Sequence, residues 1–304
     1  MEDVKYPYLP EGWEIKFVPE SNEFMQEAKD ARDRLAGDTL YPVGGVLIKD
    51  RKVIGKAGNG YNRGRDTIHI CPRYVANVPS GERYDLCDLH EHPGHSERMV
   101  LKDAMEKGID PSGSDIYLYG HWWCCEPCWN ALIEAGVANV YLVEGAHEQF
   151  ARDNVYSETL TPSVKSIYFS YGLTNLPDEE RAYRAEFLEL LAQTGEQLGL
   201  STYLPHLHTD PIKNADLSAE EVFNHDVQTL KEHDVVVAEV TYPSLGTGGE
   251  LMVALQEKKP IVLISKKGTH VSRFATGNPA VVYHIEYEDE QEVCDKLQRV
   301  LRQL

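Results

Sequence analysis

Two short motifs about thirty residues apart limit what the first half of this chain can fold into. The first places His95 two residues before Glu97, and the second is the pair Cys125 and Cys128. One imidazole and two thiolates give a tetrahedral zinc ion three protein ligands and leave the fourth position open for water. Glu97 can lie beside such a metal without ligating it and can move protons. A Cys-x-x-Cys pair alone also fits a redox pair or a structural zinc knuckle, so the His-x-Glu motif is what favours a hydrolytic centre.

A second pattern, in the last quarter of the chain, combines a buried strand, a glycine-rich turn and the start of a helix. Residues 234–240 form an almost unbroken apolar run, the following turn contains Gly246 and Gly248, and a helical pattern covers Glu250–Gln256. Backbone N–H groups at such a helix start can hold a phosphate, helped by the helix dipole. A carboxylate beside a phosphate is electrostatically unfavourable, so Glu250 makes chemical sense if it faces a sugar carbon.

The order of expected elements predicts two α/β domains. A chain of 304 residues suits two domains of ordinary size. We expect one domain over residues 1–150, a linker without periodicity over 151–163, and a second domain over 164–304. Strands and helices alternate after the linker, which favours a doubly wound parallel sheet of the Rossmann-like kind. Expected helices include Glu23–Leu35, Ser96–Lys107, Pro127–Ala135 and a helix that Ser218 opens with a capping box; expected strands include Ile116–Tyr119, Asn139–Val143 and Ser166–Ser170.

Charge and cysteine content narrow the class of protein. The net charge is −19 and the isoelectric point is near 5.0, so the chain repels polyanions and we expect no polymeric nucleic acid as partner. Six cysteines, three of them clustered, favour metal ligation in a reducing compartment over disulfides. The N-terminus shows no signal pattern and no apolar run approaches the length of a membrane span, so we expect a soluble cytoplasmic protein.

The zinc motifs and their flanks resemble the deoxycytidylate (dCMP) deaminase family. His-x-Glu followed by Cys-x-x-Cys is the pattern of zinc cytidine deaminases, and the flanking segments 41–48, 60–62 and 131–137 extend the resemblance over roughly residues 15–147. It implies a cytidine deaminase-like α/β/α domain. It also implies that zinc is bound by His95, Cys125 and Cys128, that Glu97 shuttles the proton, and that Asn62 contacts the nucleotide sugar.

This half departs from the family pattern in one loop. Cys124 stands where the family has proline, and the run His121–Trp123 stands where it has a small polar residue. Cys125 rather than Cys124 keeps the family spacing to Gly136, so we expect Cys125 to be the ligand. The loop closes over the base in these enzymes, so the departure leaves the base preference open.

The second half resembles the nucleoside 2-deoxyribosyltransferase superfamily, and within it the 2′-deoxynucleoside 5′-monophosphate N-hydrolase branch. The run from Ser244 to Leu251, with Tyr168 and Asp226, carries the resemblance over residues 164–304. It implies that Glu250 is the nucleophile at the anomeric carbon, that Tyr168 orients it, and that Asp226 assists at the base or sugar. The implied phosphate-binding residues are Ser244, Gly246 and Gly248, and Ser272 would reach the phosphate pocket of a neighbouring subunit, which implies a homo-oligomer.

The second half also departs from its nearest branch, and several residues have plainer interpretations. Segment 170–175 lacks the arginine that the hydrolase branch has there, so glycosidic cleavage is better supported than phosphate preference. Ser244 could merely cap a helix, and Asp226 could be a surface acid. A further set of possible ligands could bind a second, structural zinc, but we expect unpaired loop residues; the set is His69, Cys71, Cys87, His90 and His92.

The two resemblances imply a bifunctional, zinc-dependent enzyme that acts on a small pyrimidine nucleotide. A dCMP-like nucleotide would be deaminated to its uracil form, and the N-glycosidic bond of that product would then be hydrolysed to free base and 2-deoxyribose 5-phosphate. A modified base such as 5-hydroxymethylcytosine is suggested by metabolic logic, because dCMP and dUMP are useful metabolites. The alternatives are a ribonucleotide (CMP-like) deaminase and N-hydrolase, or a non-catalytic nucleotide-sensing module.

Overall fold

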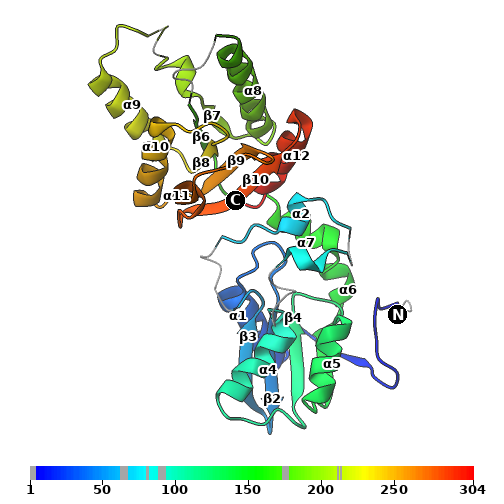
Figure 1. Cartoon of the computed structure of the whole chain (residues 1–304). Coiled ribbons are helices and arrows are strands. Elements are labelled where there is room, and N and C mark those ends of the chain that lie inside the picture. Colours follow the sequence, from blue (N-terminus) through cyan, green and yellow to red (C-terminus); the bar gives the residue numbers. More distant parts are fainter. Residues whose placement is uncertain are drawn as a thin grey trace. The chain divides into compact units, whose positions relative to one another are not determined.

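The structure, a computed structural model, divides into two compact α/β units (Figure 1). The boundary along the chain lies between Thr161 and Pro162. It describes residues 5–61, 68–79, 82–87, 94–172, 178–210, 212 and 214–304. The expected fold class is confirmed in both units, which are considered separately below. Within the described residues, no helix combines the length and apolar character needed to span a bilayer.

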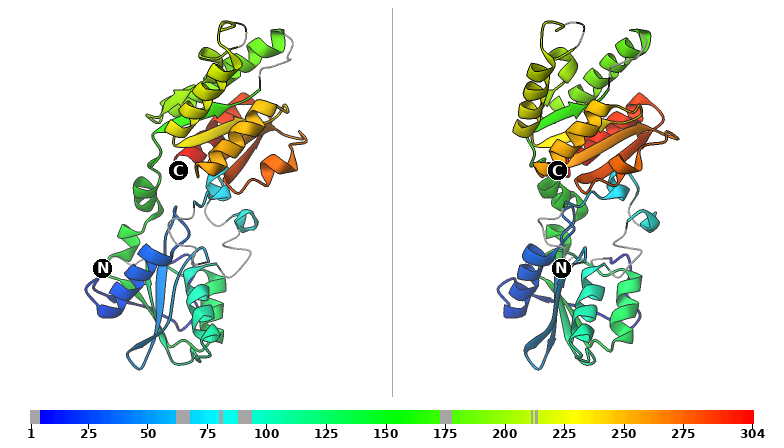
Figure 2. Two further views of the ribbon diagram at one scale, coloured as in Figure 1. Left: turned by 90° about the vertical axis from the view of Figure 1, so that its left-hand side faces the viewer. Right: turned by 60° about the vertical axis from the view of Figure 1, so that its left-hand side comes forward.

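The first unit is a five-stranded mixed sheet with helices on both faces. Its strand order is β1-β5-β4-β2-β3, where β2 is antiparallel to β3 and β4, and β5 is parallel to β4 and β1. Figure 2 shows α1 on one face and α4 and α5 on the other. The strands are β1 (Ile15–Val18), β2 (Gly44–Lys49), β3 (Lys52–Gly58), β4 (Asp115–Tyr119) and β5 (Asn139–Val143); the helices are α1 (Glu23–Leu35), α4 (Ser96–Glu106) and α5 (Glu126–Glu134).

Two adjacent glycines of β2 explain how closely these helices approach the sheet. A Cβ atom on Gly44 would lie 2.0 Å from the backbone nitrogen of Arg32 in α1. A Cβ atom on Gly45 would lie 2.9 Å from the hydroxyl of Ser96 in α4. Neighbouring strand residues point to opposite faces, so one glycine makes room for α1 and the next makes room for the N-terminus of α4, where the zinc motif begins.

The segment expected to be a linker is largely helical. It contains α7 (Arg152–Thr159), which follows the short α6 (Ala146–Gln149). Val155 is buried, and the Thr159 hydroxyl donates to the carbonyl of Leu40 at 2.8 Å. A two-turn helix with one buried side chain has no amphipathic periodicity, which is why the pattern did not reveal it. Two more short helices, α2 (Pro72–Val75) and the 3₁₀ helix η1 (Tyr84–Leu86), complete this unit.

The second unit is a fully parallel five-stranded sheet in the order β10-β9-β8-β6-β7. Helices α8 and α12 pack together on one face, and α9 and α10 pack together on the other (Figure 1). The strands are β6 (Ser166–Ser170), β7 (Ser201–Tyr203), β8 (Val235–Glu239), β9 (Ile261–Lys266) and β10 (Val281–Tyr287); the helices are α8 (Asp178–Glu196), the 3₁₀ helix η2 (Pro205–Leu207), α9 (Ala219–Glu232), α10 (Leu245–Gln256), α11 (Arg273–Thr276) and α12 (Glu290–Leu301).

The strand order places a ligand crevice at the end of β6. The chain runs from β6 to β7 on one side and then returns to β8 on the other, so the direction of winding reverses at β6. In such sheets, ligands bind outside the carboxyl ends of the strands at this reversal. Residues 166–170 and the start of α10, which follows β8, lie there. The expected capping box is present, with Ser218 and Glu221 bonded reciprocally at the start of α9.

Candidate active sites

Three possible metal ligands of the first unit converge at the starts of two helices. His95 is the N-cap residue of α4 and Cys125 is that of α5, and neither side chain caps its helix. The Nδ1 atom of His95 lies 3.5 Å from the sulfur of Cys125 and 3.4 Å from that of Cys128. Ligands on a tetrahedral zinc ion at about 2.0–2.3 Å are separated by about 3.6 Å. The two distances from His95 therefore match those expected around a zinc ion, and all three ligand atoms lie within 4.8 Å of one another.

The ionisation of the cluster agrees with metal binding. The pKa of the Cys125 thiol is lowered to about 5, chiefly by a hydrogen bond with Cys128 and further by one with His95. Cys124 is fully buried, and burial next to the Glu97 carboxylate raises the pKa of its thiol. A thiolate is the ligand form of cysteine. The structure thus groups Cys125, rather than Cys124, with the histidine.

Glu97 lies beside this cluster, in the first turn of α4, with only 7% of its surface exposed. It lines a cavity of about 400 Å³ together with His95 and Cys125. The same cavity is lined by Trp122 and Trp123, which belong to the loop that departs from the deaminase pattern. A cavity of this volume is within the range of small-ligand sites, about 300–1,000 Å³.

Two polar residues of this cavity were not expected from the sequence. Asn59 and Asp38 are both buried. The Asn59 side chain accepts from the N–H of Val43 at 3.0 Å and donates to the carbonyl of Tyr41 at 2.9 Å, while Asp38 accepts from the N–H of Tyr41 at 3.1 Å. They hold the loop before β2 in place. These backbone partners of Asn59 are 16 and 18 residues away, whereas Asp38 accepts from backbone N–H groups two and three residues ahead, as many turn residues do. Asn62, expected at the sugar, lies outside the described residues.

A second cluster of possible ligands corrects the expectation of unpaired loop residues. Possible ligand atoms of His69, Cys71 and Cys87 lie within 4.8 Å of one another. The pKa of Cys71 is lowered to about 4, chiefly by a hydrogen bond with Cys87. A structural zinc site takes four ligands, and the described residues could supply three of them. His90 and His92 lie outside the described residues.

The His95 cluster predicts the metal content of one variant directly. Cys125→Ser is expected to remove about one equivalent of zinc per chain, because the site loses one of three protein ligands. Elemental analysis of protein purified without added metal measures this. Cys294→Ser, in α12 of the other unit, is the matched control and is expected to keep the wild-type zinc content. Unchanged zinc in Cys125→Ser would remove this cysteine from the ligand set.

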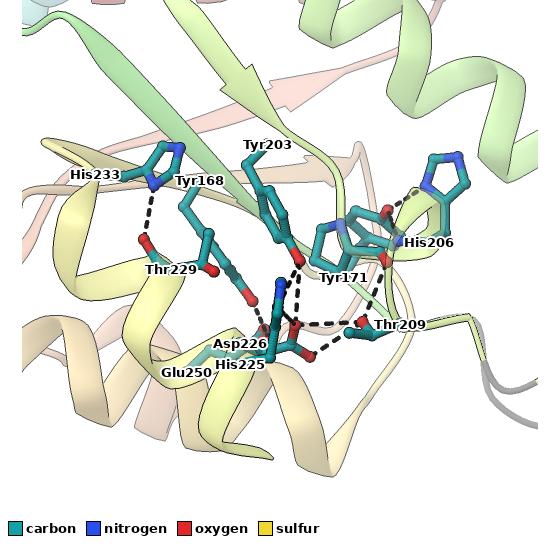
Figure 3. A network of polar contacts seen from close by, with 11 residues as sticks. Tyr168, Tyr171, Tyr203, His206, Thr209, His225, Asp226, Thr229, His233 and Glu250 are labelled. Atoms are coloured by element: carbon teal, nitrogen blue, oxygen red, sulfur yellow. Dashed lines mark hydrogen bonds and ion pairs between the residues drawn. The ribbon is translucent and has the colours of Figure 1, made fainter. Parts of the chain in front are cut away.

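Glu250 of the second unit is held by two hydroxyl groups of β6, those of Tyr168 and Ser170, and Figure 3 shows the contact with Tyr168. The Tyr168 hydroxyl donates to one carboxylate oxygen at 2.8 Å, and the Ser170 hydroxyl donates to the other. Tyr168 and Ser170 alternate along the strand and therefore share a face. Burial raises the pKa of Glu250, and the two hydroxyl bonds oppose that rise. Burial and the nearby Glu250 charge also raise the pKa of Tyr168, so it remains a donor.

Asp226 of α9 is part of the same polar network (Figure 3) and is not a surface acid. Its carboxylate accepts from Thr209 at 3.2 Å and from Tyr203 at 3.3 Å, and it lies 3.5 Å from Nδ1 of His225. Burial raises the pKa of Asp226, and its charge contributes to the raised pKa of Glu250. Two carboxyl groups with raised pKa values at one strand end are typical of a catalytic site. Thr209, Tyr203 and His225 were not expected from the sequence.

The residues expected to bind phosphate lie at the start of α10, except for Ser272. Ser244 is the N-cap residue, and its hydroxyl accepts from the N–H of Thr247 at 3.3 Å. Gly246 and Gly248 lie in the first turn of α10 rather than in a turn before it. Ser272 caps the short helix α11, where its hydroxyl accepts from the N–H of Phe274 at 3.3 Å. Its role at a neighbouring subunit stays a prediction.

Comparison with known proteins finds a match for each half. Residues 19–144 match the model of the cytidine and deoxycytidylate deaminase zinc-binding region. A protein of Thermofilum pendens named "Putative 2'-deoxynucleoside 5'-phosphate N-hydrolase 1" is 32% identical over 115 residues, which are 36% of this chain and 80% of that protein. The chain belongs to this N-hydrolase family. The expected fusion of a dCMP deaminase-like domain with an N-hydrolase-like domain is thereby confirmed.

Two further proteins are similar to parts of this chain. A 5-hydroxymethyl-dUMP N-hydrolase of Rattus norvegicus is 32% identical over 100 residues, which are 33% of this chain and 60% of that protein. The solved structure of a CMP N-glycosidase of Clostridium botulinum is 24% identical and covers 44% of this chain and 97% of its own, with a TM-score of 0.33.

Proposed function

We propose that this chain is a bifunctional nucleotide hydrolase. The first unit deaminates a dCMP-like nucleotide, and the second hydrolyses the N-glycosidic bond of the uracil product. The matched families support an enzyme of the deaminase and nucleotide N-hydrolase type. The observation that carries the proposal of two activities is that each unit has a complete set of polar groups: His95, Glu97, Cys125 and Cys128 in one, and Tyr168, Asp226 and Glu250 in the other.

In the deaminase cavity, the protein's task is to bind the base and move protons. Zinc held by His95, Cys125 and Cys128 would supply an activated water for addition at C4 of cytosine. The Glu97 carboxylate takes up a proton from the attacking water and delivers it to the amino group that leaves as ammonia. Trp122 and Trp123 line the cavity and restrict the space around the base.

In the second unit, Glu250 acts as the nucleophile at the anomeric carbon. Its carboxylate must be ionised to attack, and the Tyr168 and Ser170 hydroxyls stabilise that charge and fix its direction. The C1′–N1 bond breaks as the Glu250–C1′ bond forms, and the base leaves with its bonding electrons. Asp226, whose pKa is raised by burial, supplies the proton that the leaving base needs. Water then cleaves the glycosyl ester and releases 2-deoxyribose 5-phosphate.

A panel of cytosine nucleotides tests the proposed substrate class. We propose 5-hydroxymethyl-dCMP as a natural substrate, and the similar rat protein, named for 5-hydroxymethyl-dUMP, supports the base that would reach the second unit. Wild-type protein is incubated with dCMP, 5-hydroxymethyl-dCMP and CMP, and the uracil form and free base are quantified. Turnover of CMP alone would favour the ribonucleotide alternative. Binding without turnover of any of the three would favour the nucleotide-sensing alternative.

The proposed phosphate contact makes a prediction about Gly248. A Cβ atom on this residue would meet no protein atom within 4 Å, and the same is true of Gly249. Alanine is favoured over glycine in a helix by about 1 kcal/mol, so neither variant should unfold. If the 5′-phosphate packs against the N–H groups of this turn, Gly248→Ala should lower kcat/KM for cleavage of the monophosphate by about tenfold, which is about 1.4 kcal/mol.

The comparison with an uncharged substrate makes this prediction specific. Wild-type protein should cleave the nucleoside roughly a hundredfold more slowly than its monophosphate if the phosphate anchor contributes about 3 kcal/mol. Gly249→Ala, one residue further along the helix, is the control and should retain the preference. Equal cleavage of nucleoside and monophosphate by the wild type would favour the nucleoside-transferring branch of the superfamily instead.

We also propose that the second unit forms homo-oligomers through an apolar surface. Three of its most exposed large apolar side chains are Phe223 of α9, Leu245 of α10 and Phe274 of α11, of which Leu245 is 99% exposed. Leu245 lies next to the proposed phosphate turn, and Phe274 lies two residues after Ser272. The positions of Leu245 and Phe274 agree with an arrangement in which a second copy of the chain brings its Ser272 to the phosphate.

A further inference from the structure

Three basic side chains that are far from the zinc motif in the sequence line the deaminase cavity. Arg73, His147 and Arg152 line the same cavity as His95 and Glu97. The cavity is also lined by the carboxyl groups of Asp38 and Glu97, so its charge is mixed, whereas the chain as a whole carries a net charge of −19. A nucleotide monophosphate has one neutral reacting end, the base, and one anionic end. The metal-ligand residues suit the first end, and the basic residues suit the second.

Of the three, Arg152 is the one whose charge is available to a ligand. The Arg73 guanidinium donates to the carbonyls of Glu82 and Pro79 at 2.9 and 3.1 Å, and His147 pairs with Glu148 at 2.8 Å. Arg152 makes no ion pair within the part of the chain that the structure describes. Its guanidinium lies over the ring of Tyr156, 5.4 Å from the centroid.

The helix that carries Arg152 is fixed against the cavity by its other residues. Tyr156 lines the cavity and makes edge contacts with Tyr41 and Tyr74, at centroid distances of 6.4 and 5.6 Å. Ala151, the N-cap residue of α7, also lines the cavity and has no side chain that could cap the helix. The positive end of the α7 dipole lies at this wall together with Arg152, and Asp153 in the same first turn partly offsets that charge.

Helix α7 lies beyond the part of the chain that matches the deaminase model, which ends at residue 144. We propose that α7 is the phosphate-binding wall of the deaminase site and that Arg152 contacts the 5′-phosphate of the substrate. This inference rests on the proposed deaminase function. It names the Arg152 guanidinium as the group that makes the deaminase site selective for nucleotides over nucleosides. The segment that joins the two units would thus be part of the first active site.

The test compares two substrates that differ only in the phosphate. Arg152→Gln is expected to lower kcat/KM for deamination of dCMP by about ten- to a hundredfold, the range for loss of a charge-assisted hydrogen bond. Deamination of deoxycytidine should change by less than about twofold, because it has no phosphate to lose. Arg152→Lys should recover part of the loss for dCMP. Arg34→Gln, an exposed arginine of α1 with 77% side-chain exposure, is the control and should leave both substrates unchanged.

A binding measurement separates this inference from the chemistry. In a Glu97→Gln background, titration with dCMP and with deoxycytidine is followed through the fluorescence of Trp122 and Trp123, which line the cavity. Adding Arg152→Gln should weaken binding of dCMP by the same ten- to a hundredfold and leave deoxycytidine unaffected. Equal losses for both ligands, or no loss for dCMP, would overturn the role of Arg152 while leaving the deaminase function intact. Failure of the function itself would appear as wild-type protein that deaminates neither compound.

Discussion

Glu97→Gln is expected to lower the rate of deamination by about 10²–10⁴-fold, the range for loss of a positioned acid–base group. Glutamine keeps the size of the side chain in its buried position but cannot carry the proton from water to the leaving amino group. Base release from supplied uracil nucleotide should stay at the wild-type rate, because Glu250 belongs to the other unit. The two rates are measured separately, as ammonia released from dCMP and as uracil released from dUMP.

A neighbouring carboxylate provides the control for this prediction. Glu106 lies at the end of the same helix, is exposed and is within 3.8 Å of Lys102. Glu106→Gln should leave both rates unchanged. A Glu97→Gln protein that deaminates normally would remove Glu97 from the mechanism. Loss of base release in the same variant would show that the two activities are not separate.

Glu250→Gln is expected to lower base release from the uracil nucleotide by about 10³-fold or more, which corresponds to about 4 kcal/mol of barrier. The amide oxygen can accept from one of the Tyr168 and Ser170 hydroxyls, and the amide N–H group can donate to the other. The amide cannot form the glycosyl ester. Deamination should continue, so the uracil nucleotide should accumulate when dCMP is supplied. Chromatography of the reaction mixture distinguishes accumulation of this intermediate from a loss of both activities.

The pH dependence of base release by the wild type tests the assignment of Glu250. Burial raises the pKa of this carboxyl, and the attacking form is the ionised one. Base release should therefore fall as the pH is lowered, and the fall should begin at a higher pH than for an ordinary glutamate. Glu257→Gln, at the exposed end of the same helix, is the control and should keep the wild-type profile. A profile without this acidic limb would argue against a buried carboxylate nucleophile.

The residues that the sequence predicted best are those whose role is local. Helix α1 and strands β5 and β6 lie at their expected bounds, because each has a strong periodic or apolar pattern. The spacing of His95, Cys125 and Cys128 also indicated the group of possible metal ligands that the structure brings together, with His95 and Cys125 as the N-cap residues of α4 and α5. Helix α10 begins five residues earlier than expected, at Leu245, because glycines within its first turn read as a loop.

The residues that the sequence did not predict depend on contacts between distant segments. Asn59 and Asp38 face the deaminase cavity only because of the path of the loop before β2. The His69 cluster combines two loops, and Tyr203 reaches Asp226 from a neighbouring strand. Helix α7 has one buried residue and no periodicity. The proposed phosphate-binding wall of the deaminase site therefore has the sequence pattern of a linker.

The identity of the first free base released from a cytosine nucleotide tests the central proposal most directly. Wild-type protein is given dCMP or 5-hydroxymethyl-dCMP, and ammonia, the uracil-form nucleotide and both possible free bases are followed over time. Deamination before cleavage predicts that ammonia is released first, that the uracil nucleotide rises transiently, and that every free base is the uracil form. Release of the cytosine-form base, with no ammonia preceding it, would contradict the proposed order and the joint function of the two units.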